Sequence, residues 1–139
     1  MTALSRLAWS HAALNCADQT ATERFYRRWL GFERVRAVRL GDQQIIFLRN
    51  DHVLLELFQD NGTSLFEPAA GGSPNHGVIR HLAFETDDVD AFLAALGDEA
   101  PVTLGPPDFY DYIPEWRAGW LLDPDGVIVE VSQGYRDRT

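Results

Sequence analysis

Cysteine is nearly absent from this chain, and its scarcity limits the sites that the chain can build. Cys16 is the one thiol among 139 residues, so no disulfide can form within the chain. A chain without internal disulfides suits a reducing compartment, and we expect a cytoplasmic protein. We also expect Cys16 to be a small core residue, because no neighbouring motif would activate its thiol.

Long apolar runs and an excess of positive charge are missing as well. No uninterrupted apolar stretch is long enough to span a membrane. Ser10 and His11 interrupt the opening segment, which therefore does not resemble a signal peptide. A formal net charge of −9 argues against nucleic-acid binding, because phosphate backbones require a basic face. We expect neither a membrane nor a nucleic-acid partner, and the acidity mildly favours neutral or cationic small ligands.

The pattern that the chain does contain is an internal repeat. Each half begins with a strand-like segment carrying a histidine, continues into a helical stretch led by an aspartate, and ends with a strand-like segment carrying a glutamate. The histidines, His11 and His81, are 70 residues apart, and the glutamates, Glu56 and Glu130, are 74 apart. A repeat of this length indicates two half-domains around one core, because solenoids need three or more shorter units.

Hydrophobic periodicity and turn residues predict the element order βαβββ in each half. In the first half we expect strands at 7–15, 32–39, 43–49 and 52–59, with a helix between Asp18 and Gly31. In the second half we expect strands at 78–86, 101–104, 116–122 and 127–133, with a helix at 88–97. The prediction is one α+β domain, 1–139, with a first module at about 6–59, a linker or lid at 60–77 and a second module at about 78–133.

Strand parity predicts where the repeated polar residues point. Side chains alternate between the two faces of a strand, so Glu130 shares its face with Ser132 and not with the flanking valines. The same parity places His11, Glu56 and His81 opposite the apolar residues that pack under the helices. An unpaired carboxylate on such a face is costly to bury. We therefore interpret the four residues as ligands of one divalent metal ion.

Over about residues 7–133 the chain resembles the vicinal oxygen chelate superfamily, which includes glyoxalase I, extradiol dioxygenases and bleomycin-resistance proteins. The resemblance is carried by the motif FYRRWLGF at 25–32 and by LDPDG at 122–126, which leads into Glu130. It implies paired βαβββ modules whose mixed sheet curls into a cup around a metal. It also implies that His11, Glu56, His81 and Glu130 occupy the ligand positions of the glyoxalase I-like members.

These ligand types restrict both the metal and the chemistry. Imidazoles and carboxylates suit one divalent ion such as Zn, Ni, Fe, Co or Mn, and the absence of thiolates argues against a closed structural zinc site. Such an ion would polarise a carbonyl or enediolate oxygen. The resemblance implies that Glu130 is the catalytic proton carrier and Glu56 a static ligand. We expect an enzyme with glyoxalase I-like lyase or isomerase chemistry on a small oxygenated substrate.

Two other functions stay open. An Fe(II) extradiol-type, ring-cleaving dioxygenase needs two histidines and one carboxylate, which His11, His81 and Glu130 would supply; a fourth ligand at Glu56 favours proton transfer instead. A non-catalytic, antibiotic-sequestering protein of the bleomycin-resistance type would be acidic and aromatic-lined, but would not need all four ligands. The chain departs from glyoxalase I in having no basic cluster assignable to a glutathione adduct.

The segment 108–116 is rich in aromatic residues and also contains three carboxylates. One interpretation is a loop folded over its own aromatic side chains. The other is a ligand-binding surface, in which Phe109, Tyr110, Tyr112 and Trp116 contact the substrate by stacking and hydrogen bonding. The sequence does not distinguish the two.

Assembly is a further expectation. Two small open sheets leave exposed edges, and symmetric pairing is the commonest way to cover them. The resemblance also implies dimers with sites at or near the subunit interface, sometimes by exchange of modules across 60–77. We therefore expect a homodimer.

Overall fold

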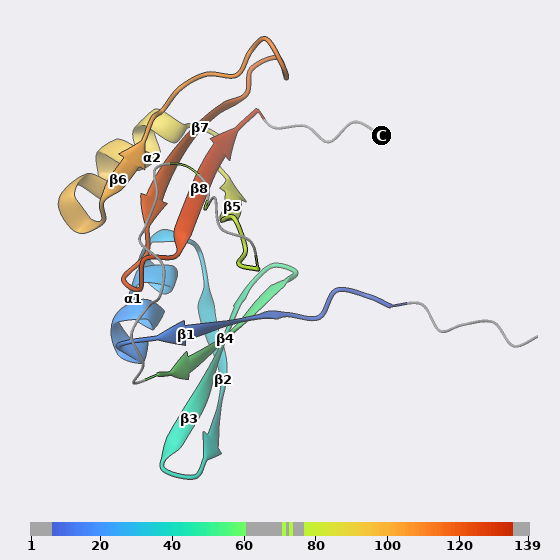
Figure 1. Ribbon diagram of the computed structural model, residues 1–139, viewed down its shortest axis with the longest axis vertical. Coiled ribbons are helices and arrows are strands. Elements are labelled where there is room, and N and C mark those ends of the chain that lie inside the picture. Colours follow the sequence, from blue (N-terminus) through green and yellow to red (C-terminus); the bar gives the residue numbers. More distant parts are fainter. Residues whose placement is uncertain (1–6, 61–70, 72, 74–76, 135–139) are drawn as a thin grey trace, which may run out of the picture. The chain divides into compact units, whose positions relative to one another are not determined.

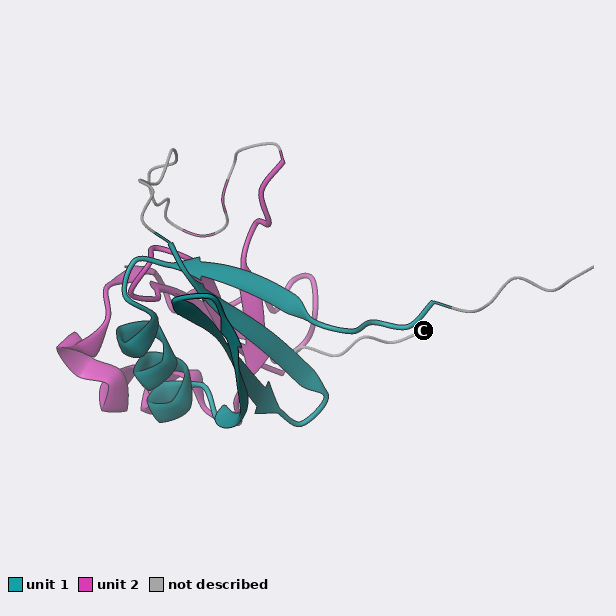
Figure 2. Cartoon of the chain, turned by 90° about the horizontal axis from the view of Figure 1, so that it is seen from below, with its two compact units in different colours: residues 1–61 teal, residues 62–139 magenta. Residues whose placement is uncertain are grey.

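The computed structural model describes residues 7–60, 71, 73 and 77–134. Most of the linker predicted at 60–77 lies outside these residues. The chain divides into two compact units, Met1–Asn61 and Gly62–Thr139, which we call unit 1 and unit 2 and describe separately (Figure 2). Neither α-helix in the described ranges has the length and apolar character needed to cross a membrane.

Unit 1 contains one helix and one four-stranded mixed sheet (Figure 1). Its elements are β1 (Ala12–Cys16), α1 (Gln19–Trp29), β2 (Glu33–Leu40), β3 (Gln43–Asn50) and β4 (Val53–Gln59). The strand order is β1-β4-β3-β2, with β1 parallel to β4 and the other pairs antiparallel. Strand β1 therefore lies beside the last strand of its own module.

Unit 2 repeats this arrangement. Its elements are β5 (Leu82–Glu85), α2 (Val89–Leu96), the 3₁₀ turn η1 (Gly97–Glu99), β6 (Val102–Leu104), β7 (Arg117–Leu122) and β8 (Ile128–Gln133). The strand order β5-β8-β7-β6 matches that of unit 1, and β5 is parallel to β8. The predicted α+β architecture of paired βαβββ modules is thus present in the structure.

Both helices begin where the sequence indicates. The Asp18 carboxylate accepts hydrogen bonds from the backbone N–H groups of Thr20 and Ala21, at 3.1 and 3.2 Å. The Asp88 carboxylate accepts one from Ala91, at 3.0 Å. Side-chain acceptors at these positions satisfy amide groups that have no partner within the helix. Two aspartates therefore fix the starts of both helices.

The first strand of each module is shorter than expected, and the start of its partner strand limits how far back it could extend. In the observed registers, Ala12 is opposite Leu55 and Leu82 is opposite Val129. Extending β1 back to residue 7 would place its first residues opposite the turn before β4, and extending β5 would reach the turn before β8. His11 and His81 lie immediately before β1 and β5 rather than inside them, although the same registers continued by one residue place them opposite Leu54 of β4 and Ile128 of β8.

Each unit has a buried apolar layer between its helix and its sheet. In unit 1 the ring of Tyr26 makes edge contacts with Phe25 and Phe32, at centroid distances of 5.7 and 5.6 Å. Leu55 and Leu57 of β4 are buried, and Glu56 between them faces the other way. Cys16 is fully buried, as expected for a core residue. The face opposite the helix is left for the polar residues of the repeat.

Candidate functional site

In unit 1, the sheet register brings His11 and Glu56 together. Ala13 is directly opposite Glu56 in the parallel pair of β1 and β4, and His11 precedes Ala13 by two residues on the same face. His11 and Glu56 are therefore diagonal neighbours, and the small side chain of Ala13 leaves room between them. The distance from His11 Nε2 to Glu56 Oε2 is 3.2 Å.

Unit 2 builds the same pair from the equivalent residues. Ala83 is opposite Glu130 in the parallel pair of β5 and β8, and His81 precedes Ala83 by two residues. The distance from His81 Nε2 to Glu130 Oε1 is 3.8 Å. Both histidines thus direct Nε2 toward a carboxylate oxygen. Four of the residues singled out in the sequence form two equivalent pairs, one in each unit.

The serine hydrogen bond involves a different member of the pair in each unit. In unit 1 it involves the histidine, because the Ser10 hydroxyl and His11 Nδ1 are hydrogen-bonded at 2.8 Å. In unit 2 it involves the glutamate, because the Ser132 hydroxyl donates a hydrogen bond to Glu130 Oε2 at 2.8 Å. Trp116 Nε1 donates in turn to the Ser132 hydroxyl, at 3.3 Å. The serines were not among the residues expected from the sequence.

The composition of the pairs suits a divalent cation. The Glu130 side chain is only 9% exposed, and no arginine forms an ion pair with Glu56 or Glu130 in the described part of the chain. The buried Nδ1 atom of His81 has no hydrogen-bond partner among the described residues. Largely buried carboxylates without a paired arginine attract a cation, and imidazole with carboxylate is a common donor set for divalent metals. Within the described residues no three potential ligands gather in one group, so each unit by itself offers two.

A cavity of about 460 Å³ adjoins the pair of unit 2. It is lined by His81, Ala83, Phe84, Glu85, Trp116, Glu130 and Ser132. Two aromatic rings and an alanine give it apolar walls, while Glu130 and His81 supply polar atoms at one side. This mixture is typical of small-molecule sites. No basic side chain is among the lining residues of this cavity.

The aromatic segment 108–116 combines both interpretations offered by the sequence. Phe109 packs against Trp116 and Trp120, with ring centroids 4.5 and 5.9 Å apart, so part of the loop folds over its own rings. Trp116 also lines the cavity beside Glu130. Tyr110 lines a separate hollow of about 680 Å³ together with Glu85, and Tyr112 is 80% exposed. Of the four aromatic residues expected to contact substrate, only Trp116 borders the cavity that contains Glu130.

Comparison with known proteins gives the family. A search of curated proteins found no match. Among solved structures, the glyoxalase family protein from Enterococcus faecalis is 27% identical, with a TM-score of 0.66 over 88% of this chain and 94% of that chain. An integron cassette protein from V. cholerae is 24% identical, with a TM-score of 0.63 over 96% of this chain and 100% of that chain.

A mutant of the fosfomycin resistance protein FosX from Listeria monocytogenes, solved with Mn(II) and 1S,2S-dihydroxypropylphosphonic acid, has a TM-score of 0.71. It is 19% identical and aligns over 94% of this chain and 93% of that chain, a likeness that shows the fold alone. The sequence model of the Glyoxalase/Bleomycin resistance protein/Dioxygenase superfamily matches residues 9–131. With the duplicated βαβββ fold and the resemblance of the two motifs, this match shows that the chain belongs to that superfamily, the vicinal oxygen chelate superfamily.

Proposed function

We propose that the protein is a divalent-metal-dependent enzyme that moves a proton on a small oxygenated substrate, in the manner of a glyoxalase I-like lyase or isomerase. In this proposal His11, Glu56, His81 and Glu130 bind one ion. The observation that carries it is the duplicated histidine–glutamate pair, with Nε2-to-oxygen distances of 3.2 and 3.8 Å in equivalent positions of the two units. A repeat that places the same two donor types on the same sheet face twice is hard to explain by packing alone.

The proposed ion would be Zn, Ni, Fe, Co or Mn, all of which accept imidazole and carboxylate ligands. When bound, it supplies Lewis acidity to a carbonyl or enediolate oxygen of the substrate. The two histidines would bind through Nε2, the atom that each directs at its glutamate. Ser10 beside His11 Nδ1 supports that orientation, because a hydrogen bond at one ring nitrogen fixes the other toward the metal.

Glu130 is the proposed proton carrier, and its surroundings support that role. Ser132 donates to Oε2, which leaves Oε1 on the side of His81. The carboxylate borders a cavity large enough for a small substrate, so a substrate C–H or O–H group can approach it. Glu56 has no equivalent serine, since Phe58 occupies the matching position of β4, which suits a static ligand better than a positioned base.

The lining of the cavity restricts the charge of the substrate. Glu85 and Glu130 contribute carboxylates and no arginine is present. The FosX structure from Listeria monocytogenes contains Mn(II) and a phosphonic acid, but a phosphonate here would meet the carboxylate of Glu85 with no arginine in the lining, so that only the proposed metal ion would offset its charge. We therefore propose a neutral or cationic substrate, held against Phe84 and Trp116. Phe109 would support Trp116 from behind, and Tyr110 and Tyr112 would contact only a substrate that extends beyond the cavity.

Non-catalytic sequestration of an aromatic antibiotic is the second candidate. The observation that favours it is the pair of aromatic walls, Phe84 and Trp116, around the cavity. In a pure binder, affinity for the drug should be unchanged after the metal is stripped with chelator. Tight binding that survives chelation, with no turnover, would replace the enzymatic proposal.

Metal analysis of the full chain tests the proposal. We expect about one divalent ion per chain in protein purified without chelator, and loss of most of it in the variants His81→Ala and Glu56→Ala. His52→Ala is the matched control, because His52 is 96% exposed and contacts only a surface aspartate in the described residues. If the His81 variant retains as much metal as the His52 variant, the ligand assignment is wrong. An activity that requires iron and oxygen and survives Glu56→Ala would indicate ring cleavage instead.

We also propose a homodimer. Strand β2 is an edge of its sheet, and all eight of its residues are exposed. An uncovered edge of that length presents unpaired backbone groups that a second copy could cover. Light scattering at micromolar concentration should give twice the mass of the 139-residue chain, and a monomer would contradict the proposal.

A further inference from the structure

Arginine is unevenly distributed along this acidic chain. Residues 7–60 contain seven arginines and seven acidic residues, whereas residues 77–134 contain two arginines and twelve acidic residues. Four of the seven line one groove of about 600 Å³ between α1 and the start of β2. The groove is lined by Thr20, Glu23, Arg24, Arg27, Arg28, Phe32, Glu33 and Arg34. We call it the arginine groove.

We propose that the arginine groove binds a small phosphorylated ligand, recognised as a phosphate dianion. Four arginines against two glutamates give the lining a local charge of +2, in a chain whose net charge is −9. A dianion matches that local charge. The groove also has the volume of a small-ligand site, so it can hold a phosphate together with a compact organic group.

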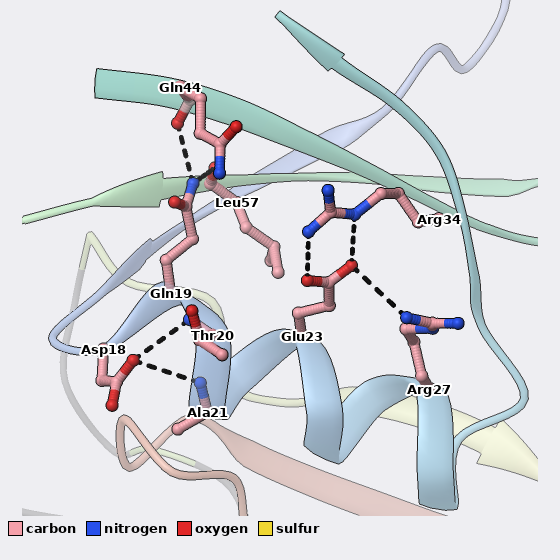
Figure 3. A network of polar contacts seen from close by, with 9 residues as sticks. All are labelled: Asp18, Gln19, Thr20, Ala21, Glu23, Arg27, Arg34, Gln44 and Leu57. Carbon is pink, nitrogen blue, oxygen red and sulfur yellow. Dashed lines mark hydrogen bonds and ion pairs between the residues drawn. The ribbon is translucent and has the colours of Figure 1, made fainter. Parts of the chain in front are cut away.

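Glu23 holds part of this basic surface in place (Figure 3). Its side chain is only 8% exposed, and its two oxygens accept hydrogen bonds from Arg34 Nε and Nη2 at 2.6 and 2.5 Å. Arg27, one helical turn further on, lies 3.9 Å from the same carboxylate. One buried carboxylate thus positions two guanidinium groups from different elements.

Arg34 also keeps Glu23 in its ionised, carboxylate form. Its hydrogen bonds with Arg34 lower the pKa of the carboxyl below the usual glutamate value, and they raise the pKa of the guanidinium. The pair therefore stays charged at neutral pH. Because Glu23 is already neutralised, the remaining positive charge of the groove faces an incoming anion.

Arg28 is positioned by a different contact. Its guanidinium lies over the ring of Trp29, 5.2 Å from the ring centroid. Three of the four arginines are thus restrained by neighbours, which reduces the side-chain entropy lost on binding. Arginine also presents paired N–H donors in the geometry that a phosphate accepts. Positive charge alone would attract any anion weakly. Because these guanidinium groups are restrained and present paired donors, we expect the groove to bind phosphate selectively.

Calorimetric titration of the full chain with inorganic phosphate, glucose 6-phosphate and glucose tests this inference. We expect saturable binding of both phosphates and no binding of glucose. Tighter binding of the ester than of the free ion would show that the rest of the groove contacts the organic group; equal binding would identify free phosphate as the ligand. Absence of saturable binding by either phosphate would overturn the proposal.

Paired variants locate the site. Arg24→Gln with Arg28→Gln removes two groove arginines, whereas Arg36→Gln with Arg39→Gln removes the same charge from the exposed strand β2, outside the groove. We expect the groove variant to bind phosphate at least about tenfold more weakly, since one hydrogen bond between charged groups is worth roughly that factor. The β2 variant should change affinity less than about twofold. Equal weakening in both would show a general effect of net charge and refute a localised site.

Discussion

The ion pair of Glu23 and Arg34 gives a stability prediction whose size follows from its geometry. Replacing Arg34 with glutamine leaves the Glu23 carboxylate, which is 8% exposed, with Arg27 at 3.9 Å as its nearest cation. Removing one partner of a fully buried pair costs about 3–5 kcal/mol, whereas an exposed pair is worth about 0–1 kcal/mol. Arg34 is 40% exposed, so the pair lies between these limits. We expect Arg34→Gln to lower the free energy of unfolding by about 2 kcal/mol.

The pH dependence of this loss checks its cause. Arg34 lowers the pKa of Glu23 in the folded protein, so the pair stabilises the fold above the ordinary glutamate pKa and loses this contribution as pH falls through the lowered value. Urea denaturation of the parent and the Arg34→Gln variant should therefore show a difference at pH 7 that shrinks in acid.

A double-mutant cycle with Glu23→Gln isolates the pair from other effects of the substitutions. The cycle should give a coupling energy of about 1–2 kcal/mol at pH 7. A loss that is the same in acid and at neutral pH, or a coupling energy near zero, would refute the assignment of this stability to the ion pair.

Three further predictions concern the proposed site and the helix starts. Glu56→Ala should weaken metal binding, while Glu130→Gln should abolish turnover even where metal remains, and metal titration beside steady-state kinetics separates the two effects. Ser132→Ala should leave the metal content near the parent value but lower kcat by roughly tenfold, because Glu130 loses its positioning hydrogen bond; an unchanged kcat would remove Ser132 from the mechanism. Asp18→Ala should cost about 1 kcal/mol of stability through loss of the two cap hydrogen bonds, measured by thermal unfolding against the exposed control Asp42→Ala.

Most of the fold could be predicted from local sequence patterns. The aspartates before each helix and the alternation along β4 predict the caps and the buried face. Strand parity also predicts that His11, Glu56, His81 and Glu130 lie opposite the apolar residues. The register that makes each histidine a neighbour of its glutamate is known only from the observed pairing of β1 with β4 and of β5 with β8. The starts of β1 and β5 were predicted too early, since strand propensity does not reveal where a partner strand ends.

Contacts between distant side chains could not be predicted in the same way. The bidentate pair of Glu23 and Arg34 joins a helix to a strand, and its formation depends on where β2 begins relative to α1. Ser132 shares a strand face with Glu130, so parity offered a signal for that hydrogen bond. The indole hydrogen bond from Trp116 to Ser132 had no such signal, because it depends on how the loop at 108–116 folds.

The division of the donor residues between two compact units has a thermodynamic consequence. If one ion takes a histidine and a glutamate from each unit, its binding free energy is available only when both units are folded. Ligand that binds only the native state stabilises it by an amount that grows with the logarithm of ligand concentration. Under that proposal, bound metal would raise the unfolding temperature of both units together, because neither unit alone supplies all four ligands.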